Sequence, residues 1–106
     1  MKARRAKRQN ALERIREERA EVAATAQRLA VLLQAGVAPT AAWGQLDHRA
    51  AREIADRVRA GNATPDAIAA AGESWHELAA AWRVAVAVGA PLAEALRSFA
   101  AGMRDA

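Results

Sequence analysis

The sequence contains no cysteine and no tyrosine, and it has only one phenylalanine, three prolines and six glycines in 106 residues. The absence of cysteine excludes disulfides, thiolate metal ligands and a cysteine nucleophile. The alternation of β-branched and aromatic residues that marks strands is almost absent, whereas 32 residues are alanine, the best helix former. The composition therefore predicts an all-α fold whose small side chains let the helices approach closely.

The sequence also lacks an uninterrupted apolar run of membrane-spanning length. The longest uncharged segment, residues 29–46, comes close to the roughly 20 residues that a bilayer requires. It contains glutamine, glycine and proline, however, and owes much of its apolar character to alanine. The basic N-terminus is followed by the charged residues 12–21 and not by the apolar stretch of a secretory signal. We expect the 106 residues to form one soluble domain with a single modest core.

Positive charge is concentrated at one end of the chain. Residues 1–19 hold eight basic and three acidic side chains, whereas residues 20–106 hold eight basic and nine acidic ones. The excess positive charge therefore belongs to the N-terminal segment, and the remainder is close to neutral. We expect residues 1–9 to form a disordered or frayed basic arm that precedes a helical domain of residues 10–106. The basic residues of this arm are Lys2, Arg4, Arg5, Lys7 and Arg8.

Three junctions, each a glycine followed shortly by a proline, divide the rest of the chain. Glycine is favoured just past a helix end because it adopts the left-handed conformation without strain, and proline fits the first turn of the next helix. The three junctions therefore predict corners between antiparallel helices. Their residues are Gly36 and Pro39, Gly61 and Pro65, and Gly89 and Pro91.

Apolar residues at spacings of three and four predict a long first helix from Asn10 to about residue 35. Its early part is weakly apolar and is expected to project, whereas its second part is expected to dock. Five shorter helices are predicted over residues 39–45, 48–60, 65–71, 75–88 and 91–104. The candidate N-caps are Asn10, Asp47, Thr64 and Ser74. We therefore expect a compact antiparallel bundle of about six helices with a long first helix.

The large apolar side chains fall on the inward faces of these helices. For the three tryptophans, this position favours a role in the core over ligand stacking. Val86 is also expected to face inward. The predicted core anchors are Leu29, Leu33, Trp43, Ile54, Trp75, Trp82, Leu96 and Phe99.

No pattern in the sequence predicts an active centre. His48 and His76 lack further ligands at metal-binding spacings, so we expect capping or surface roles for them. No phosphate-binding glycine motif is present. Acidic residues in the first turn of a helix are favoured there by the helix dipole, and no particular pair of acids is indicated as catalytic. The available acids are Glu53, Asp56, Asp66, Glu73, Glu77 and Glu94. We predict a non-enzymatic protein without catalytic, cofactor-binding or metal-binding residues.

The basic arm is compatible with an anionic membrane surface, with nucleic acid or an acidic protein, or with solvent alone. An anionic membrane surface attracts such a basic segment with roughly 1 kcal/mol for each Lys or Arg near it. Nucleic-acid modules usually carry their positive charge on a folded face, often beside aromatic residues. Here the folded part has balanced charge and the arm has no aromatic residue. The pattern therefore favours a position beside a membrane and makes nucleic acid a less favoured partner.

Three segments resemble the landmark segments of the type II secretion system F domain. They are residues 29–43 (LAVLLQAGVAPTAAW), 59–70 (RAGNATPDAIAA) and 82–100 (WRVAVAVGAPLAEALRSFA). This domain is the cytoplasmic part of the platform proteins GspF, PilC, TadB and TadC, and the resemblance covers about residues 22–103. GspF and PilC relatives tend to show G-E-x-x-G-x-L in the third segment, whereas this chain has Gly-Ala-Pro-Leu at 89–92. The resemblance is therefore greatest to the TadB/TadC branch.

The resemblance implies a helical domain at the cytoplasmic face of the bacterial inner membrane, held there by hydrophobic helices outside this chain. Such platforms serve Tad or type IV pilus assembly and type II protein secretion. They couple an assembly ATPase to pilin extraction without bond chemistry of their own. The implied partners are that ATPase, other platform subunits in a homo- or hetero-oligomer, and pilins. The alternative is a free-standing basic helical protein that binds nucleic acid or a regulator.

Overall fold

The computed structural model describes residues 2–105. Six α-helices and one short 3₁₀ helix account for 83% of the described residues, among which no strand occurs. The predicted all-α bundle is therefore confirmed. In chain order the elements are α1 (Lys2–Gln34), α2 (Pro39–Gly44), α3 (Arg49–Arg59), α4 (Thr64–Ala69), η1 (Glu73–Trp75), α5 (His76–Val88) and α6 (Leu92–Asp105).

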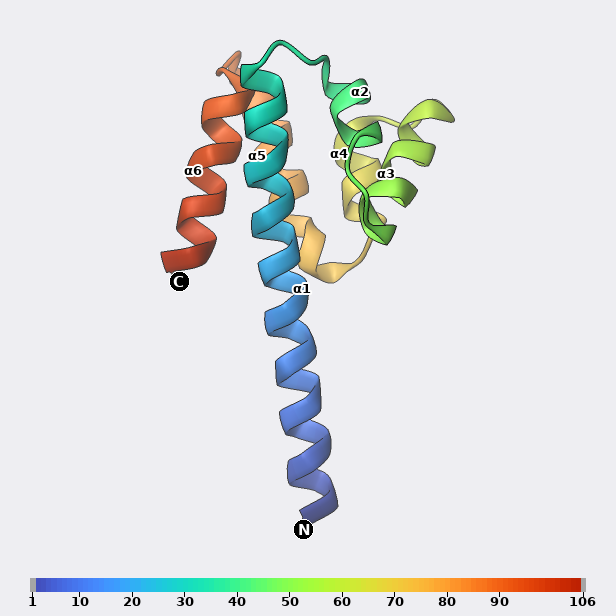
Figure 1. The fold of residues 1–106 in the computed structure, drawn as a ribbon, viewed down its shortest axis with the longest axis vertical. Helices are drawn as coiled ribbons and strands as arrows, with labels where there is room; N and C mark the ends of the chain where they lie inside the picture. Colours follow the sequence, from blue (N-terminus) through green and yellow to red (C-terminus); the bar gives the residue numbers. More distant parts are fainter. Residues whose placement is uncertain (1, 106) are drawn as a thin grey trace.

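The helices pack around the second half of α1, and successive helices alternate in direction (Figure 1). α6 runs antiparallel beside α1 and forms the most extensive contact between two helices. α5 packs against α6 and α4, and the short helices α2, α3 and α4 form a group on the other side of α1. The C-terminal half of α1 thus lies between two groups of helices.

The first half of α1 projects out of the bundle and gives the molecule its length, with principal extents of 52 × 30 × 23 Å. Residues 2–20 are called the stem below. The prediction that residues 1–9 are disordered or frayed was wrong for the described residues 2–9, because α1 begins at Lys2 and runs without a break. Residues 2–9 are alanine, lysine, arginine and glutamine, with an intrinsic helix preference and no breaker. The docked half supplies the helical nucleus from which they extend.

A single cluster of buried side chains joins all six helices. Six of the eight predicted anchors are buried in it, and the other two, Leu33 and Phe99, are half-buried against it. Val86 was wrongly expected to face inward, since 64% of its surface is exposed. The buried stripe of α5 follows Leu78, Trp82 and Ala85, and Val86 lies beside that stripe near the end of the helix.

The three glycines of the junctions lie where helices end. Each adopts a positive φ, with values of 93° at Gly36, 102° at Gly61 and 68° at Gly89. L-residues avoid this conformation, so glycine is the residue that can turn the chain here without strain. Pro39 and Pro65 lie in the first turns of α2 and α4, and Pro91 directly precedes α6.

The predicted N-caps were wrong, because capping depends on neighbours that the local sequence does not show. Asn10 lies inside α1, and Asp47 comes one residue before the actual cap of α3, His48. Thr64 is the first residue of α4 and follows the cap position. Ser74 lies inside η1, where its hydroxyl donates a hydrogen bond to Glu18 Oε2 at 2.8 Å instead of capping α5.

Candidate interaction surface: the stem and its junction with the bundle

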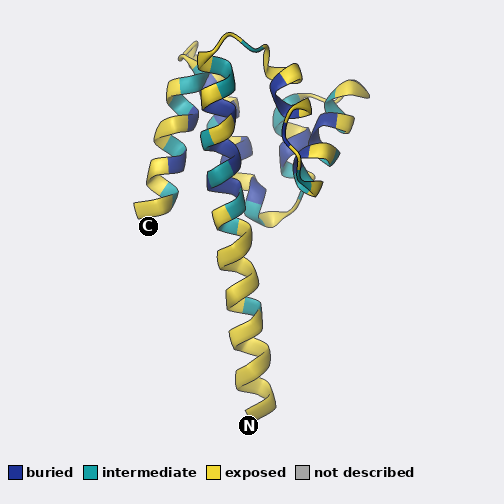
Figure 2. Cartoon of the chain, viewed as in Figure 1, coloured by how far each residue is buried: buried dark blue, intermediate teal, exposed yellow. Residues whose placement is uncertain are grey.

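The basic residues of the predicted arm lie on the free end of the stem, and all of them are exposed (Figure 2). Burial along α1 becomes continuous only from Val22 onward. At about 1.5 Å per residue, Lys2 lies about 30 Å along the helix axis from Val22. The positive charge is therefore held at a distance from the bundle by a helix that continues into the core.

Three polar contacts attach α1 to other elements at the base of the stem and at Glu21, directly after it. Besides the bond from Ser74 to Glu18, Arg19 Nη1 lies 3.6 Å from Glu77 Oε1 at the start of α5. The third contact joins Glu21 to His48 at the start of α3. Exposed ion pairs contribute little stability by themselves. Here they join the stem base to η1, α5 and α3.

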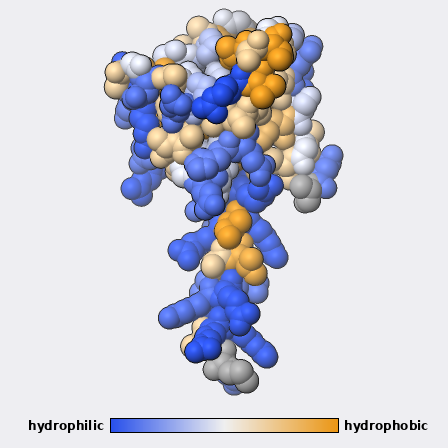
Figure 3. Space-filling model, turned by 180° about the vertical axis from the view of Figure 1, so that it is seen from behind, coloured by the Kyte–Doolittle hydropathy of each residue, from blue (hydrophilic) through white to orange (hydrophobic). Residues whose placement is uncertain are grey.

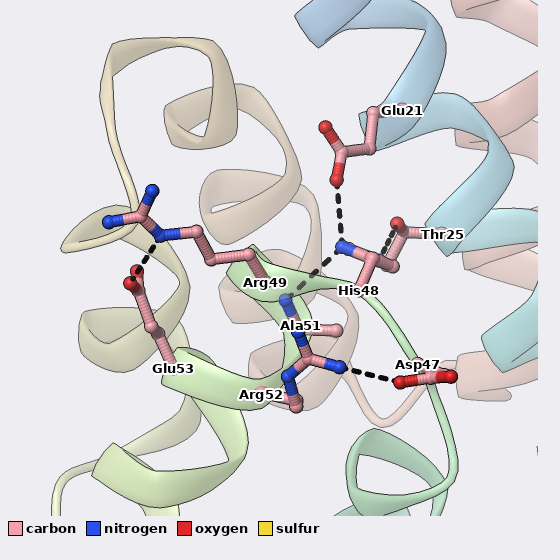
Figure 4. A network of polar contacts seen from close by, with 8 residues as sticks. All are labelled: Glu21, Thr25, Asp47, His48, Arg49, Ala51, Arg52 and Glu53. Carbon is pink, nitrogen blue, oxygen red and sulfur yellow. Dashed lines mark hydrogen bonds and ion pairs between the residues drawn. The ribbon is translucent and has the colours of Figure 1, made fainter.

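His48 forms the centre of the most connected of these contacts (Figure 4). Its Nδ1 lies 2.7 Å from Glu21 Oε1, and its Nε2 lies 2.9 Å from the hydroxyl of the fully buried Thr25. The same Nδ1 lies 3.4 Å from the backbone nitrogen of Ala51 and accepts its hydrogen bond as the cap of α3. The ring also stacks on Trp75, with centroids 6.2 Å apart.

The two contacts at Nδ1 exclude each other chemically. When Nδ1 carries a proton it donates to Glu21, and when it carries a lone pair it accepts from the Ala51 N–H. In either case His48 joins α1 to the beginning of α3. The sequence analysis predicted a capping or surface role for His48, and the structure shows the capping contact together with this link to α1.

Replacing His48 by alanine is expected to lower the free energy of unfolding by about 1–3 kcal/mol, because the change removes a helix cap and leaves the buried Thr25 hydroxyl without its partner. The matched control is Asp47→Ala, the cap that the sequence predicted. Asp47 is exposed and, among residues 2–105, its carboxylate bonds only to Arg52, so its loss should cost less than about 0.5 kcal/mol. Urea unfolding of the two variants measures the difference, and equal losses would contradict the role of His48.

Of the six acidic residues that the sequence offered, two share a groove and three others are paired with arginines. Glu53 and Glu73 line an open groove of about 510 Å³ at the base of the stem, together with Glu18 and Glu21 of α1. Local sequence held no signal for this grouping, because the two pairs are far apart in the chain. Three of the other candidates are paired with arginines: Asp56 with Arg59, Asp66 with Arg83 and Glu77 with Arg19.

Within residues 2–105 there is no group of three histidine, aspartate or glutamate side chains placed to hold a metal ion. His76 is the exposed first residue of α5. In the same range, every helix falls short of the length and apolarity needed to cross a bilayer.

Fold and surface together define a helical bundle that carries a projecting basic helix. Comparison with known protein families, with curated proteins and with solved structures finds no match. The resemblance to the type II secretion system F domain therefore stays a prediction from the three sequence segments.

Proposed function

We propose that this chain is a non-enzymatic cytoplasmic domain of an inner-membrane platform protein. The platform would serve Tad or type IV pilus assembly, or type II secretion, and would couple an assembly ATPase to pilin extraction. The proposed family rests on the resemblance of three sequence segments to the type II secretion system F domain. The observation that carries the proposal is the stem, a continuous helix that holds five basic side chains away from a folded bundle.

The stem suits a domain held beside an anionic bilayer. Basic residues favour the cytoplasmic flank of a membrane, where lipid headgroups are negatively charged. Lys2, Arg4, Arg5, Lys7 and Arg8 would contact this boundary. The bundle would then stand clear of the membrane, where soluble partners can reach it.

The same helix provides a mechanical link. Residues 22–30 of α1 contribute much of the core, so a displacement of the bundle is carried to the stem without passing through a loop. A domain of this kind transmits movement between a motor that contacts the bundle and membrane segments near the stem.

The test is in-cell cross-linking in the organism that encodes the chain. A photo-reactive residue on the exposed surface of the bundle, at Val84, should capture the assembly ATPase or another platform subunit, identified by mass spectrometry. The same residue placed in an unrelated tagged bundle in the same cells is the control. Capture of nucleic acid or a transcriptional regulator, with no secretion component, would contradict the platform role and favour the alternative drawn from the sequence.

A further inference from the structure

One face of the stem combines two exposed arginines and one partly buried arginine with two exposed aliphatic side chains. Its members recur at helical spacings of three and four, so they lie along a single line on the helix surface. This line is called the basic strip and consists of Arg8, Leu12, Ile15, Arg16 and Arg19. Leu12 and Ile15 are each 49% exposed, and Figure 3 shows an apolar patch midway along the stem, surrounded by hydrophilic side chains.

The basic strip lies on the same side of α1 as the bundle. The spacing that runs through Leu12 and Ile15 continues into Val22, Ala26 and Leu29, which are buried against the other helices. The bundle therefore projects outward from the face of the helix that carries the strip.

The upper end of the strip opens into two hollows beneath α5 and α6. One, of about 230 Å³, is lined by Arg16, Arg19, Met103 and Arg104, together with small alanines of α1. The other, of about 280 Å³, shares Arg19 and Met103 with the first and is also lined by Glu77 and Phe99. The partly exposed side chains of Phe99 and Met103 continue the apolar character of the strip into this corner.

Two occupants fit this face poorly. A flat bilayer that touched Leu12 and Ile15 along the stem would meet the bundle, which projects on the same side. A second copy paired through the same face would place arginines opposite arginines, whichever direction the two stems ran, and like charges in contact are destabilising.

We propose that the basic strip binds an acidic amphipathic helical segment of a partner protein. Glutamate or aspartate side chains of the partner would pair with Arg8 and Arg16, while its apolar ridge covers Leu12 and Ile15. Arg19, which already lies 3.6 Å from Glu77, adds positive charge at the upper end of the strip. From Arg8 to Arg19 the strip is about 16 Å long, or about three helical turns.

The stem's own charges favour this occupant. Glu17 falls on the opposite side of the helix from most of the strip, and Glu13, three residues before Arg16, lies toward one edge, where it accepts a hydrogen bond from Gln9. Glu18 lies at the edge and is held by Ser74. The inference requires no bilayer and does not depend on the proposed platform role.

The experiment uses the full chain and a fluorescent synthetic peptide of about 18 residues, long enough to sustain a helix. The peptide carries leucines at spacings of three and four and glutamates elsewhere, and its counterpart carries lysine for every glutamate. Anisotropy titration should show binding of the acidic peptide and none of the basic one. Arg16→Glu should weaken binding about five- to tenfold, since it replaces an attraction by a repulsion.

The matched control is Arg14→Glu, which makes the same change in net charge two residues away on the other side of the helix. It should weaken binding less than about twofold. Arg14 does not contact the bound peptide, so salt screens its attraction for the peptide's glutamates. Leu12→Ala should weaken binding about fivefold, whereas Val84→Ala, at an exposed valine of α5, should leave it unchanged. Far-UV circular dichroism checks that each variant keeps its helices.

Equal losses in Arg14→Glu and Arg16→Glu would show that the peptide responds only to net charge and would overturn the proposal. Absence of binding by the acidic peptide would also overturn it. If anionic vesicles bound with the same dependence on Arg16 while the peptide did not bind, the face would be assigned to a membrane instead.

Discussion

Replacing Trp43 by alanine is expected to lower the free energy of unfolding by about 3–5 kcal/mol, the largest stability effect of any single change considered for this chain. Trp43 is fully buried and is the largest side chain with no exposed surface. It belongs to α2, a helix of only six residues, and its ring meets that of Trp82 with centroids 5.9 Å apart. Alanine would leave a cavity too large for its neighbours to fill.

The companion variant Trp43→Phe separates packing from hydrogen bonding. Within residues 2–105, Trp43 Nε1 is the only buried side-chain nitrogen or oxygen without a hydrogen-bond partner. A stranded donor of this kind costs about 1–3 kcal/mol, and phenylalanine removes that cost while it keeps an aromatic ring beside Trp82. We therefore expect Trp43→Phe to cost much less than Trp43→Ala.

Trp82→Phe is the control, because it makes the same contraction on the other ring of the pair without removing a stranded donor. It should cost more than Trp43→Phe. Urea unfolding measures the free energy of unfolding of all three variants. The dependence of this free energy on urea concentration should be the same in each, since a changed dependence would signal a different unfolded or native state. A loss below about 1 kcal/mol in Trp43→Ala would mean that α2 is not packed into the core as the structure shows.

The fold was largely predictable because its main signals are local. Glycine at a helix end acts through its own backbone, and proline acts through its own ring, so the junctions at Gly36, Gly61 and Gly89 could be read residue by residue. Apolar spacing likewise identifies the buried stripe of an amphipathic helix. Val86 was wrongly expected to face inward because apolar spacing identifies the stripe of a helix that is buried. It does not show at which residue the neighbouring helices stop covering that stripe.

The start of α1 was misread for a different physical reason. A basic segment with few apolar residues has no core of its own to stabilise it, and such segments are often disordered when isolated. Residues 2–9 are joined to a docked helix, however, so they extend an existing helix and avoid the cost of nucleation. That advantage comes from packing about 30 Å away and is invisible in a short window of sequence.

The junction at His48 was the least predictable part of the candidate site. Its partners Glu21 and Thr25 lie on α1, more than twenty residues away, and only the folded chain brings them together. Asp47, with a short carboxylate, was the better local candidate for a cap. His48 caps α3 instead, because the histidine ring can bond to α1 and to the start of α3 from one position.

Neutralising the end of the stem is expected to weaken binding to anionic vesicles by about 3–5 kcal/mol, or more than about a hundredfold. The variant replaces Lys2, Arg4, Arg5, Lys7 and Arg8 by glutamine, which keeps the helix preference and removes the charge. The change from Lys2 to Arg8 spans about 9 Å along the axis, close to one screening length at physiological salt. If the stem meets the bilayer by its end, all five charges therefore contribute.

The control variant replaces Arg14 and Arg16 by glutamine. These residues lie about 18–21 Å along the axis from Lys2, beyond two screening lengths, so their loss should change vesicle binding by less than about threefold. Co-sedimentation with vesicles of mixed anionic and zwitterionic lipid measures both variants, and added salt should weaken binding of the unmodified chain.

Equal binding by the unmodified chain and the five-residue variant would remove the membrane role of the stem, and with it the observation on which the platform proposal depends. A large loss in the Arg14 and Arg16 variant would show that the stem lies flat on the bilayer. That arrangement conflicts with the position of the bundle on the same side as Leu12 and Ile15. Binding that depends on residues 2–8 alone is therefore the result that fits both the charge distribution and the shape of the molecule.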